Sequence, residues 1–277
     1  MIKSHQVTQP LKWHGGKSYL SEWIISFMVS HLHYVEPYAG GLAVLLRKNP
    51  EGVSEVINDL DGELTNFWRV LKDNGLFEQF IRQVEATPFA QSEFEDAAEA
   101  SPDDSPVDRA VKFFIRCRQS RQGLQKDFAT MSKNRTRRGM NEQVSSWLTA
   151  IDGLSEIHER LKRVVILNED AVTLIRREDS HNTFYYLDPP YLHETRVTTN
   201  NYSFEMTAED HERLLVAMTE LKGKFLLSGY RNDLYDAFAD RHGWTRVDRE
   251  IDCKASSAKE KPKRIESLWM NYRVEEA

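Results

Sequence analysis

The sequence contains little cysteine and no long apolar run. Its two cysteines, Cys117 and Cys253, lie far apart in the 277 residues and share no motif, which is typical of a protein in a reducing cytosol. No stretch approaches the roughly eighteen apolar residues that a membrane helix needs. The first ten residues, MIKSHQVTQP, lack the apolar centre of a signal peptide. We therefore expect a cytoplasmic protein.

Metal ligands are also sparse. Apart from the isolated pair His31 and His33, no histidines or cysteines stand at the spacing of a metal site, so we expect no metal cofactor. The remaining composition is ordinary, with 40% hydrophobic and 29% charged residues. It predicts one large globular domain, or one domain that carries an insertion.

The charge is unevenly distributed along the chain. The net charge is −6, which by itself argues against a nucleic-acid partner. Residues 85–108 hold eight acids and no bases, whereas residues 109–140 hold ten bases and one acid, a local charge of +9. A phosphate backbone responds to this local potential. The basic block, residues 109–140, is therefore a candidate nucleic-acid surface, with a solvated face as the ordinary alternative.

Apolar, β-rich runs alternate with helical patterns over the first 75 residues and again from about residue 162. The candidate strands are residues 34–36, 55–58, 164–167, 183–187, 224–228, 244–251 and 265–272. Candidate helices include residues 18–30, 61–72, 207–221 and 232–241, and Thr207 can cap the third of these with Asp210 three residues on. The alternation predicts an α/β, Rossmann-like domain with a mostly parallel sheet that ends in an antiparallel hairpin.

The middle third lacks this alternation. Residues 75–161 contain helical segments, an acidic linker with Pro102 and Pro106, and the basic block, but no convincing strand. We predict a helical insertion at residues 75–161, which divides the α/β domain into residues 1–74 and 162–277.

The strongest motif is Asp188-Pro189-Pro190-Tyr191, directly after the apolar run 184–187. Ligands of open α/β sheets bind beyond the carboxyl ends of strands, where this loop begins. The prolines stiffen the turn and leave carbonyls free to accept hydrogen bonds. A carboxylate, a rigid carbonyl and an aromatic ring can together hold the exocyclic amine of a base. A plain proline-rich turn with Tyr191 as a core lid is the alternative.

Three further motifs lie at predicted turns. Trp13-His14-Gly15-Gly16-Lys17 can present backbone N–H groups and one ammonium to a carboxylate; it is not a P-loop, because Leu11 stands where that motif needs glycine. Glu36-Pro37-Tyr38-Ala39-Gly40-Gly41 follows the first strand and leads into a predicted helix at Leu42. Asn58-Asp59 ends the second strand, where an acid can bind a ribose or simply cap a helix.

These four motifs, in this order, resemble the DNA adenine methylase (Dam-type) family of adenine-N6 methyltransferases. The likeness covers both halves of the α/β region and the position of the insertion, where this family keeps its target-recognition domain. The final run, residues 266–272, also resembles the closing strand of the family. His14 replaces the alanine of many members but leaves the flanking glycines and Lys17 intact.

The resemblance implies methyl transfer from S-adenosylmethionine to N6 of a flipped adenine in double-stranded DNA. Asp188 and the Pro189 carbonyl would accept hydrogen bonds from the amine, Pro190 would stiffen the loop, and Tyr191 would stack on the base. Lys17 would lie near the methionine carboxylate, and Asp59 at the ribose. The full set of implied cofactor contacts is Trp13, Gly15, Gly16, Lys17, Glu36, Pro37, Tyr38, Gly40, Gly41, Asp59, Asp170 near the adenine, and Asp188.

In-line transfer to a flipped base needs positioning and electrostatics, with no metal and no covalent enzyme intermediate. The basic block would offset the cost of base flipping through phosphate contacts. We expect the DNA contacts among Arg116, Arg118, Gln119, Arg121, Gln122, Lys126, Asn134, Arg135, Arg137, Arg138 and Asn141. A second basic loop, residues 254–264, is either a DNA contact or a solvated hairpin loop, and residues 202–204 are either pocket lining or core.

Two rival hypotheses stay open on the sequence alone. An amino methyltransferase that acts on cytosine N4 or on RNA needs similar pocket chemistry. A DNA-binding relative with an inactive methyltransferase fold is the second, and the intact residues 188–191 and Lys17 argue against it. The resemblance also implies a nucleoid-associated protein of bacterial or phage type. A monomer on DNA fits the sequence, which sets neither the oligomeric state nor the recognition site.

Overall fold

The computed structural model describes residues 7–99, 101–129, 131, 133–192, 205–252 and 263–273. They form two compact units. The first contains the described parts of Met1–Glu22, Gly40–Asn49 and Asp61–Asn168, and the second those of Trp23–Ala39, Pro50–Leu60 and Glu169–Ala277. Within the part of the chain that is described, no helix has both the length and the apolarity of a membrane span.

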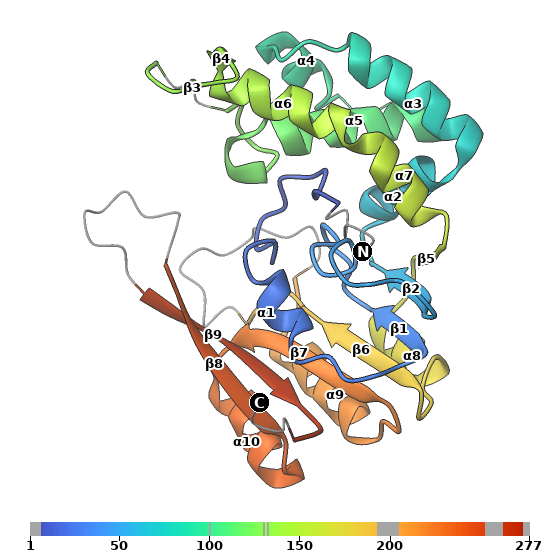
Figure 1. The fold of residues 1–277 in the computed structure, drawn as a ribbon, viewed down its shortest axis with the longest axis vertical. Coiled ribbons are helices and arrows are strands. Elements are labelled where there is room, and N and C mark those ends of the chain that lie inside the picture. Colours follow the sequence, from blue (N-terminus) through green and yellow to red (C-terminus); the bar gives the residue numbers. More distant parts are fainter. Residues whose placement is uncertain are drawn as a thin grey trace, which may run out of the picture. The chain divides into compact units, whose positions relative to one another are not determined.

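A seven-stranded sheet has the strand order β5-β2-β1-β6-β7-β9-β8 (Figure 1). Its strands are β1 (His33–Glu36), β2 (Ser54–Asn58), β5 (Val164–Leu167), β6 (Thr183–Leu187), β7 (Lys224–Tyr230), β8 (Thr245–Asp252) and β9 (Lys263–Met270). The pairs β1–β2, β1–β6 and β6–β7 are parallel, and β7–β9 and β8–β9 are antiparallel. The prediction of a mostly parallel sheet with a closing antiparallel hairpin is confirmed.

Strand direction decides which residues meet at the edge where ligands bind. The parallel strands β1, β6 and β7 all end at this edge, whereas β9 begins there because it runs the other way. Tyr230, the last residue of β7, therefore lies opposite Glu266 of β9. Directly opposed residues of an antiparallel pair project from the same face of the sheet.

Helices α8 (Ala171–Arg177), α9 (Ala208–Thr219) and α10 (Asp233–His242) lie along one face of the second unit's sheet (Figure 1). Helix α9 begins with the predicted cap, since the Thr207 side chain accepts from the Asp210 backbone and the Asp210 side chain accepts from the Thr207 backbone. Leu214, Leu215 and Met218 of α9 are buried, as the helical spacing of its apolar residues predicts.

The first unit is mainly helical. It contains α2 (Gly62–Lys72), α3 (Asn74–Ala86), α4 (Gln91–Asp96), α5 (Pro106–Gln119), the 3-10 turn η1 (Arg121–Gly123), α6 (Glu142–Asp152) and α7 (Leu154–Leu161). Aromatic rings fill its core, where Phe67 stacks on Phe114 at 6.0 Å and Phe114 contacts Trp147 at 5.2 Å. Rings of this size supply much of the apolar area that holds small helical units together.

The structure departs from the sequence predictions at three places. The helix expected over residues 18–30 is only α1 (Ser21–Ile25), followed by tight turns in which Phe27 N–H donates to Ile24. The helix expected from Leu42 is a run of turns, because Leu42 has a left-handed φ of 58° that an α-helix excludes.

The third departure is a small antiparallel ribbon in the insertion, formed by β3 (Thr136–Arg137) and β4 (Met140–Asn141). Arg138 and Gly139 connect the two strands with φ angles of 55° and 74°. Two consecutive positive φ angles match the twist of a two-residue hairpin. Sequence patterning missed the ribbon because two-residue strands are too short to show any periodicity.

Candidate catalytic loop, cofactor residues and DNA interface

The candidate catalytic loop, residues 188–191, begins where the central strand β6 ends. All five residues of β6 are buried, and the loop leaves the sheet with Pro189 buried and Asp188 half-buried. A buried strand fixes the position of the loop's first residue, while partial exposure leaves the Asp188 carboxylate accessible to a ligand. The proline-rich turn therefore lies at the ligand-binding edge of the sheet.

Tyr191 is held on two sides. Its hydroxyl donates a hydrogen bond to the carboxylate of Glu266, and its ring lies edge to face with that of Tyr230, at 4.8 Å between centroids and an interplanar angle of 73°. Burial, followed by the nearby carboxylates of Glu266 and Asp188, raises the pKa of Tyr191 well above its usual value. The phenol is therefore a hydrogen-bond donor at any physiological pH.

A second group of buried hydroxyls supports the strand ends beside this loop. The Tyr186 hydroxyl and Ser228 Oγ are 3.0 Å apart, and the Tyr34 hydroxyl donates to Glu36 Oε1 at 2.5 Å. Burial and then the Asp188 carboxylate raise the pKa of Tyr186, so this phenol also stays protonated. Buried polar groups are retained in cores when they are hydrogen-bonded, and these pairs meet that condition.

Asn58 organises three strand-end loops of the second unit. Its Nδ2 donates to the carbonyl oxygens of Pro37 at 3.1 Å and Glu169 at 3.0 Å, and its Oδ1 accepts from Glu169 N–H at 2.9 Å. The Ala39 N–H also donates to the Asn58 carbonyl at 2.8 Å. Sequence reasoning singled out Asp59 and treated Asn58 only as its neighbour. An asparagine at the end of a buried strand was the available signal, because a buried amide needs several partners.

Asp59 and Asp170, two of the four acids expected near the cofactor, have different surroundings. Asp59 does not cap the following helix, because Asp61 accepts from the Glu63 and Leu64 backbones and is the N-cap of α2. Asp170 does cap a helix: it accepts from Thr173 N–H at 2.9 Å at the start of α8, and it pairs with Arg213. Burial raises the pKa of Asp170, but hydrogen bonds from Thr173 and Arg213 outweigh it and hold the pKa below its usual value.

Tyr38 follows Glu36 and Pro37 in the loop after β1. Burial, and then the Asp170 carboxylate, raise the pKa of the Tyr38 hydroxyl above its usual value. Glu36 is thus the last residue of β1, and Pro37, Tyr38, Asp59 and Asp170 lie just after the ends of β1, β2 and β5.

In the first unit, the N-terminal motif forms a turn packed on two glycines. Gly16 N–H donates to the Trp13 carbonyl at 3.1 Å, and Lys17, only 5% exposed, donates from Nζ to the Gly15 carbonyl at 3.1 Å. A Cβ on Gly40 would lie 2.7 Å from Trp13 Nε1, and one on Gly41 would lie 2.8 Å from Trp13 Cβ. Gly40 and Gly41 are thus required for the chain's own packing against Trp13. The sequence pattern alone could not distinguish this role from close approach of a ligand to the backbone.

A cavity of about 480 Å³ lies beside this turn, within the first unit, and residues Gln9, Lys12, Trp13, Arg47 and Gln122 are among those that line it. Burial, and then the Arg118 charge, lower the pKa of Lys12 to about 8, while Glu142 acts in the opposite direction. The Lys12 ammonium donates to Gln143 Oε1 at 3.1 Å. The cavity therefore contains a lysine whose charge state changes within the range of ordinary buffers.

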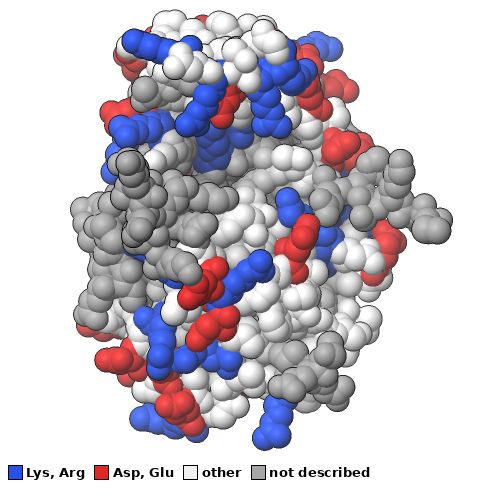
Figure 2. All heavy atoms as spheres, turned by 60° about the vertical axis from the view of Figure 1, so that its left-hand side comes forward, with Lys and Arg blue, Asp and Glu red and all other residues white. Residues whose placement is uncertain are grey.

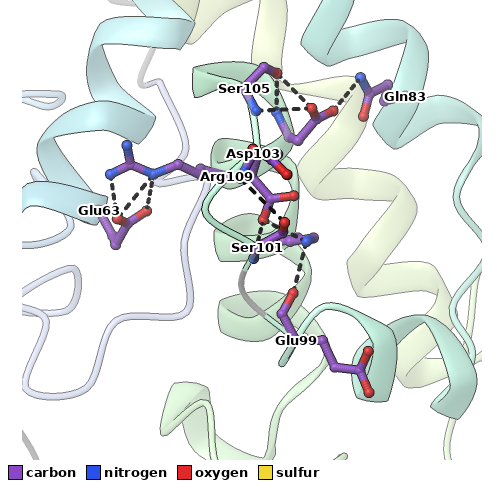
Figure 3. A network of polar contacts seen from close by, with 10 residues as sticks. Glu63, Gln83, Glu99, Ser101, Asp103, Ser105 and Arg109 are labelled. Carbon is purple, nitrogen blue, oxygen red and sulfur yellow. Dashed lines mark hydrogen bonds and ion pairs between the residues drawn. The ribbon is translucent and has the colours of Figure 1, made fainter.

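The first bases of the basic block are neutralised by acids. Arg109 is bound to the Glu63 carboxylate (Figure 3), and Lys112 donates to Asp104 Oδ2 at 2.6 Å. In the same network Ser105 and Asp108 form a capping box at the start of α5. Glu63 of α2 and Asp104 of the segment before α5 thus offset two of the ten bases in residues 109–140.

Four of the residues expected to contact DNA are engaged inside the helical unit. Arg116 lies over the Phe94 ring at 4.3 Å, and Arg118 donates to the carbonyl and hydroxyl of Ser146 at 2.6 and 2.8 Å. Burial lowers the pKa of Arg118 to about 10, so it remains charged at neutral pH. Asn141 caps α6 through the Gln143 N–H, and Gln119 is the fourth.

Gln119 is the clearest correction to the expected DNA contacts. It is fully buried, its Nε2 donates to the Pro88 carbonyl at 3.0 Å, and its Oε1 accepts from Ala90 N–H at 3.2 Å. Both ends of the amide bond to the protein and the side chain is 0% exposed, so it does not reach a base edge in this structure. The sequence alone does not show whether a glutamine at the end of an amphipathic helix is buried in the protein or exposed to DNA.

The remaining expected contacts are mostly exposed. They are Arg121, Gln122, Lys126, Asn134, Arg135, Arg137 and Arg138, in η1 and in and around the β3–β4 ribbon. Figure 2 shows several Lys and Arg side chains on the surface of the helical unit, with Asp and Glu side chains among them. Arg138 lies 3.4 Å from Asp152, and Arg135 lies 3.9 Å from Glu142, but exposed pairs of this kind are weak and can exchange partners.

Two segments that the sequence singled out lie mostly outside the described residues. Residues 202–204 and residues 254–262 are not described, whereas Arg264 lies over the Tyr230 ring at 5.0 Å. Among the described residues there is no group of three or more His, Cys, Asp or Glu side chains that could hold a metal ion.

A mostly parallel sheet with a final antiparallel strand, and an acidic, proline-rich loop at the end of its central strand, defines the class of Rossmann-like methyltransferases. The model of the D12 class N6 adenine-specific DNA methyltransferases matches residues 13–251. The chain belongs to this family. It is therefore an adenine-N6 DNA methyltransferase that uses S-adenosylmethionine and acts on DNA.

Two relatives are similar over most of their length. The chain is 29% identical to Type II methyltransferase M1.LlaDCHI of Lactococcus lactis subsp. cremoris over 230 residues, 78% of each protein. It is 23% identical to Type II methyltransferase M.CviBI of Paramecium bursaria Chlorella virus NC1A, over 82% of this chain and 86% of that protein. The solved structure of PH1948 from Pyrococcus horikoshii, named as a putative RNA methyltransferase, aligns over 92% of this chain and 82% of its own at 10% identity. Its TM-score of 0.37 is too low to support a conclusion from that likeness.

Proposed function

We propose that the catalytic loop binds the flipped adenine directly. Asp188 and the Pro189 carbonyl accept hydrogen bonds from the N6 amine, Pro190 keeps the turn rigid, and Tyr191 stacks on the base. The observation that carries this proposal is the position of the loop at the end of the buried central strand β6, with Tyr191 held by two neighbours. Held side chains bind a ligand with a smaller loss of conformational entropy.

The adenine amine is a poor nucleophile because its lone pair is delocalised into the purine ring. Two acceptors on its N–H groups draw the lone pair back onto nitrogen and orient it. When bound, S-adenosylmethionine supplies a methyl group on a positively charged sulfur. The amine would attack the methyl carbon: an N6–C bond would form as the sulfur keeps the electron pair of the C–S bond, and the nitrogen would then lose one proton to solvent. Such a displacement depends on positioning and electrostatics.

The residues at the strand ends of the second unit fit this cofactor chemically. Ribose hydroxyls donate hydrogen bonds, and Glu36, Asp59 and Asp170 place carboxylates at or after the ends of β1, β2 and β5. We therefore infer that these acids, with Pro37 and Tyr38, contact the cofactor. We propose the same role for Trp13, Gly15, Gly16 and Lys17 and for Gly40 and Gly41, on the strength of the family motifs they occupy. No metal is needed for this chemistry.

We further propose that residues 75–161 form the target-recognition insertion within a catalytic domain of residues 1–74 and 162–277. The exposed basic residues of η1 and the β3–β4 ribbon would contact phosphates or base edges, whereas Gln119 would not. Both relatives named above are Type II methyltransferases, which favours one short recognition site. A monomer in the cytoplasm of a bacterium, or of a cell infected by a phage, fits this assignment.

The reaction is tested by incubating the protein with S-adenosylmethionine and unmethylated plasmid, followed by mass spectrometry of the nucleosides. We expect N6-methyladenine, at least about a hundredfold slower with Asp188→Ala because a hydrogen-bond acceptor in the reaction is lost. Asp188→Asn keeps a carbonyl acceptor and should lose less. N4-methylcytosine as the product, or full activity of Asp188→Ala, would overturn these roles.

A further inference from the structure

Glu266 is a buried carboxylate beside the catalytic loop, on a strand 75 residues farther along the chain. It is only 1% exposed. Acidic side chains are rarely buried unless they have partners, because removal from water penalises their charge. The burial of a glutamate at the ligand-binding edge of the sheet therefore needs an explanation. From the sequence, Glu266 was identified only as a residue of the closing strand.

The sheet register brings Glu266 to Tyr191. Glu266 lies opposite Tyr230 across β7 and β9, so both side chains project from the same face. The Tyr191 side chain contacts both: its hydroxyl donates to the Glu266 carboxylate, and its ring lies against Tyr230. Arg264, two residues before Glu266 on β9, covers the Tyr230 ring at 5.0 Å. The ring of Tyr191 is thus fixed at its hydroxyl and along one side.

We propose that Glu266 is a positioning residue for methyl transfer: it holds the Tyr191 phenol, and thereby sets the ring of the catalytic loop before the adenine arrives. This inference rests on the proposed stacking of Tyr191 on the base. Without the bond, the ring would rotate about its side-chain torsions and would have to be ordered when the base docks. Misplacement by about 1 Å can cost roughly a hundredfold in rate.

The phenol is a reliable donor for this purpose. Because its pKa is raised by burial and by the neighbouring carboxylates, Tyr191 does not ionise near neutral pH, and no repulsion between a phenolate and Glu266 develops. A glutamine can replace the acceptor oxygen at this position, whereas a leucine of similar size cannot. The two substitutions therefore separate the loss of the hydrogen bond from the loss of side-chain volume.

The test measures single-turnover methylation with saturating DNA and S-adenosylmethionine for Tyr191→Phe, Glu266→Leu, Glu266→Gln and the double variant Tyr191→Phe/Glu266→Leu. We expect Tyr191→Phe and Glu266→Leu each to lower the rate about tenfold, the scale of one hydrogen bond to a charged group. The double variant should be no slower than the slower single one, because both remove the same bond. Glu266→Gln should recover part of the rate.

Three controls distinguish positioning from a purely structural role. Glu55→Gln changes another buried carboxylate of the same sheet, 1% exposed in β2, and should leave the rate unchanged. Cofactor affinity, measured by calorimetry, should be unchanged in the Glu266 variants. Fluorescence of 2-aminopurine at the target adenine should report a base that flips out but is less restrained in Glu266→Leu.

Each remaining outcome has a definite meaning. Wild-type single-turnover rates in Glu266→Leu, or multiplied effects in the double variant, would overturn the positioning role. A lower melting temperature with an unchanged rate for the folded fraction would do the same and leave Glu266 as a stabilising residue. Activity that survives Asp188→Ala would instead remove the proposed function of the loop, whichever result the Glu266 variants give.

Discussion

Asn58 and Glu169 exchange a reciprocal pair of hydrogen bonds: the Asn58 amide donates to the Glu169 carbonyl at 3.0 Å and accepts from the Glu169 N–H at 2.9 Å. A third bond runs from the same amide to Pro37 at 3.1 Å. One buried side chain thereby joins the loops after β1 and β2 to the segment that precedes α8, where the proposed cofactor acids lie.

Asn58→Ala should destabilise the fold by about 2–4 kcal/mol, because it removes the partner of the buried Pro37 carbonyl and of the partly buried Glu169 backbone. Asn58→Asp should be at least as harmful, since an aspartate cannot donate to the two carbonyls. Urea unfolding measures both, with S-adenosylmethionine affinity as a second readout. Asn182→Ala, an exposed position, is the matched control and should change stability by less than about 0.5 kcal/mol. Equal stability of Asn58→Ala and the control would refute this account.

Gly41→Ala should be destabilising, by about 1–3 kcal/mol, because the added Cβ would lie 1.8 Å from Gln9 Nε2 and 2.8 Å from Trp13 Cβ. The flexible Gln9 side chain can move, but Trp13 Cβ is fixed by the N-terminal turn. Gly62→Ala in α2 provides the comparison, since the nearest atom to its added Cβ is 4.0 Å away and alanine favours a helix. Urea midpoints should fall for Gly41→Ala and stay or rise for Gly62→Ala; similar shifts in both would show that packing against Trp13 is unimportant.

Arg137→Ala should weaken DNA binding and lower the slope of log affinity against log salt concentration by about one, if Arg137 contacts a phosphate. The measurement is fluorescence anisotropy with a labelled duplex at several salt concentrations. Arg82→Ala, an exposed arginine on α3 outside the basic block, should leave the slope unchanged.

Gln119→Ala is the complementary variant for this interface. It should lower stability with no change in the salt slope, because the amide is buried between Pro88 and Ala90. A changed slope for this variant in a fully folded protein would mean that Gln119 does reach DNA.

Stability should depend on pH through Lys12. Its pKa is about 8 in the folded protein against an ordinary value of 10.5, so between these values the unfolded chain binds a proton that the folded protein does not. The contribution of Lys12 to the free energy of unfolding is therefore lowest below pH 8 and rises as the pH increases towards 10.5. Relative to Lys12→Met, which carries no titrating group, the wild type should gain stability between about pH 8 and 10 in urea unfolding. A constant difference between the two proteins would show that Lys12 has its ordinary pKa.

Sequence patterning located every strand of the large sheet to within about two residues. Strands β1, β2, β6 and β7 are buried over most of their length, and buried strands are continuous apolar runs bounded by polar turns, whereas β5 and β8 are mostly half-buried or exposed. Helix α9 and its Thr207–Asp210 capping box were also predicted, because the two residues that form the box are only three positions apart. Two of the three departures lie at Leu42 and in the β3–β4 ribbon, where positive φ angles decide the structure and the residues concerned include leucine and arginine.

The sequence by itself determined the order of strands and helices along the chain and the family to which the chain belongs, since these depend on local periodicity and on motifs of adjacent residues. Only the tertiary structure decided which members of the basic block face outward, that Gly40 and Gly41 pack on Trp13, and that Glu266 reaches Tyr191. The physical reason is that the interacting residues are far apart in the sequence. Whether Gln119 is buried depends on Pro88 and Ala90, and whether Glu266 meets Tyr191 depends on the register of β7 with β9, which neighbouring residues do not encode.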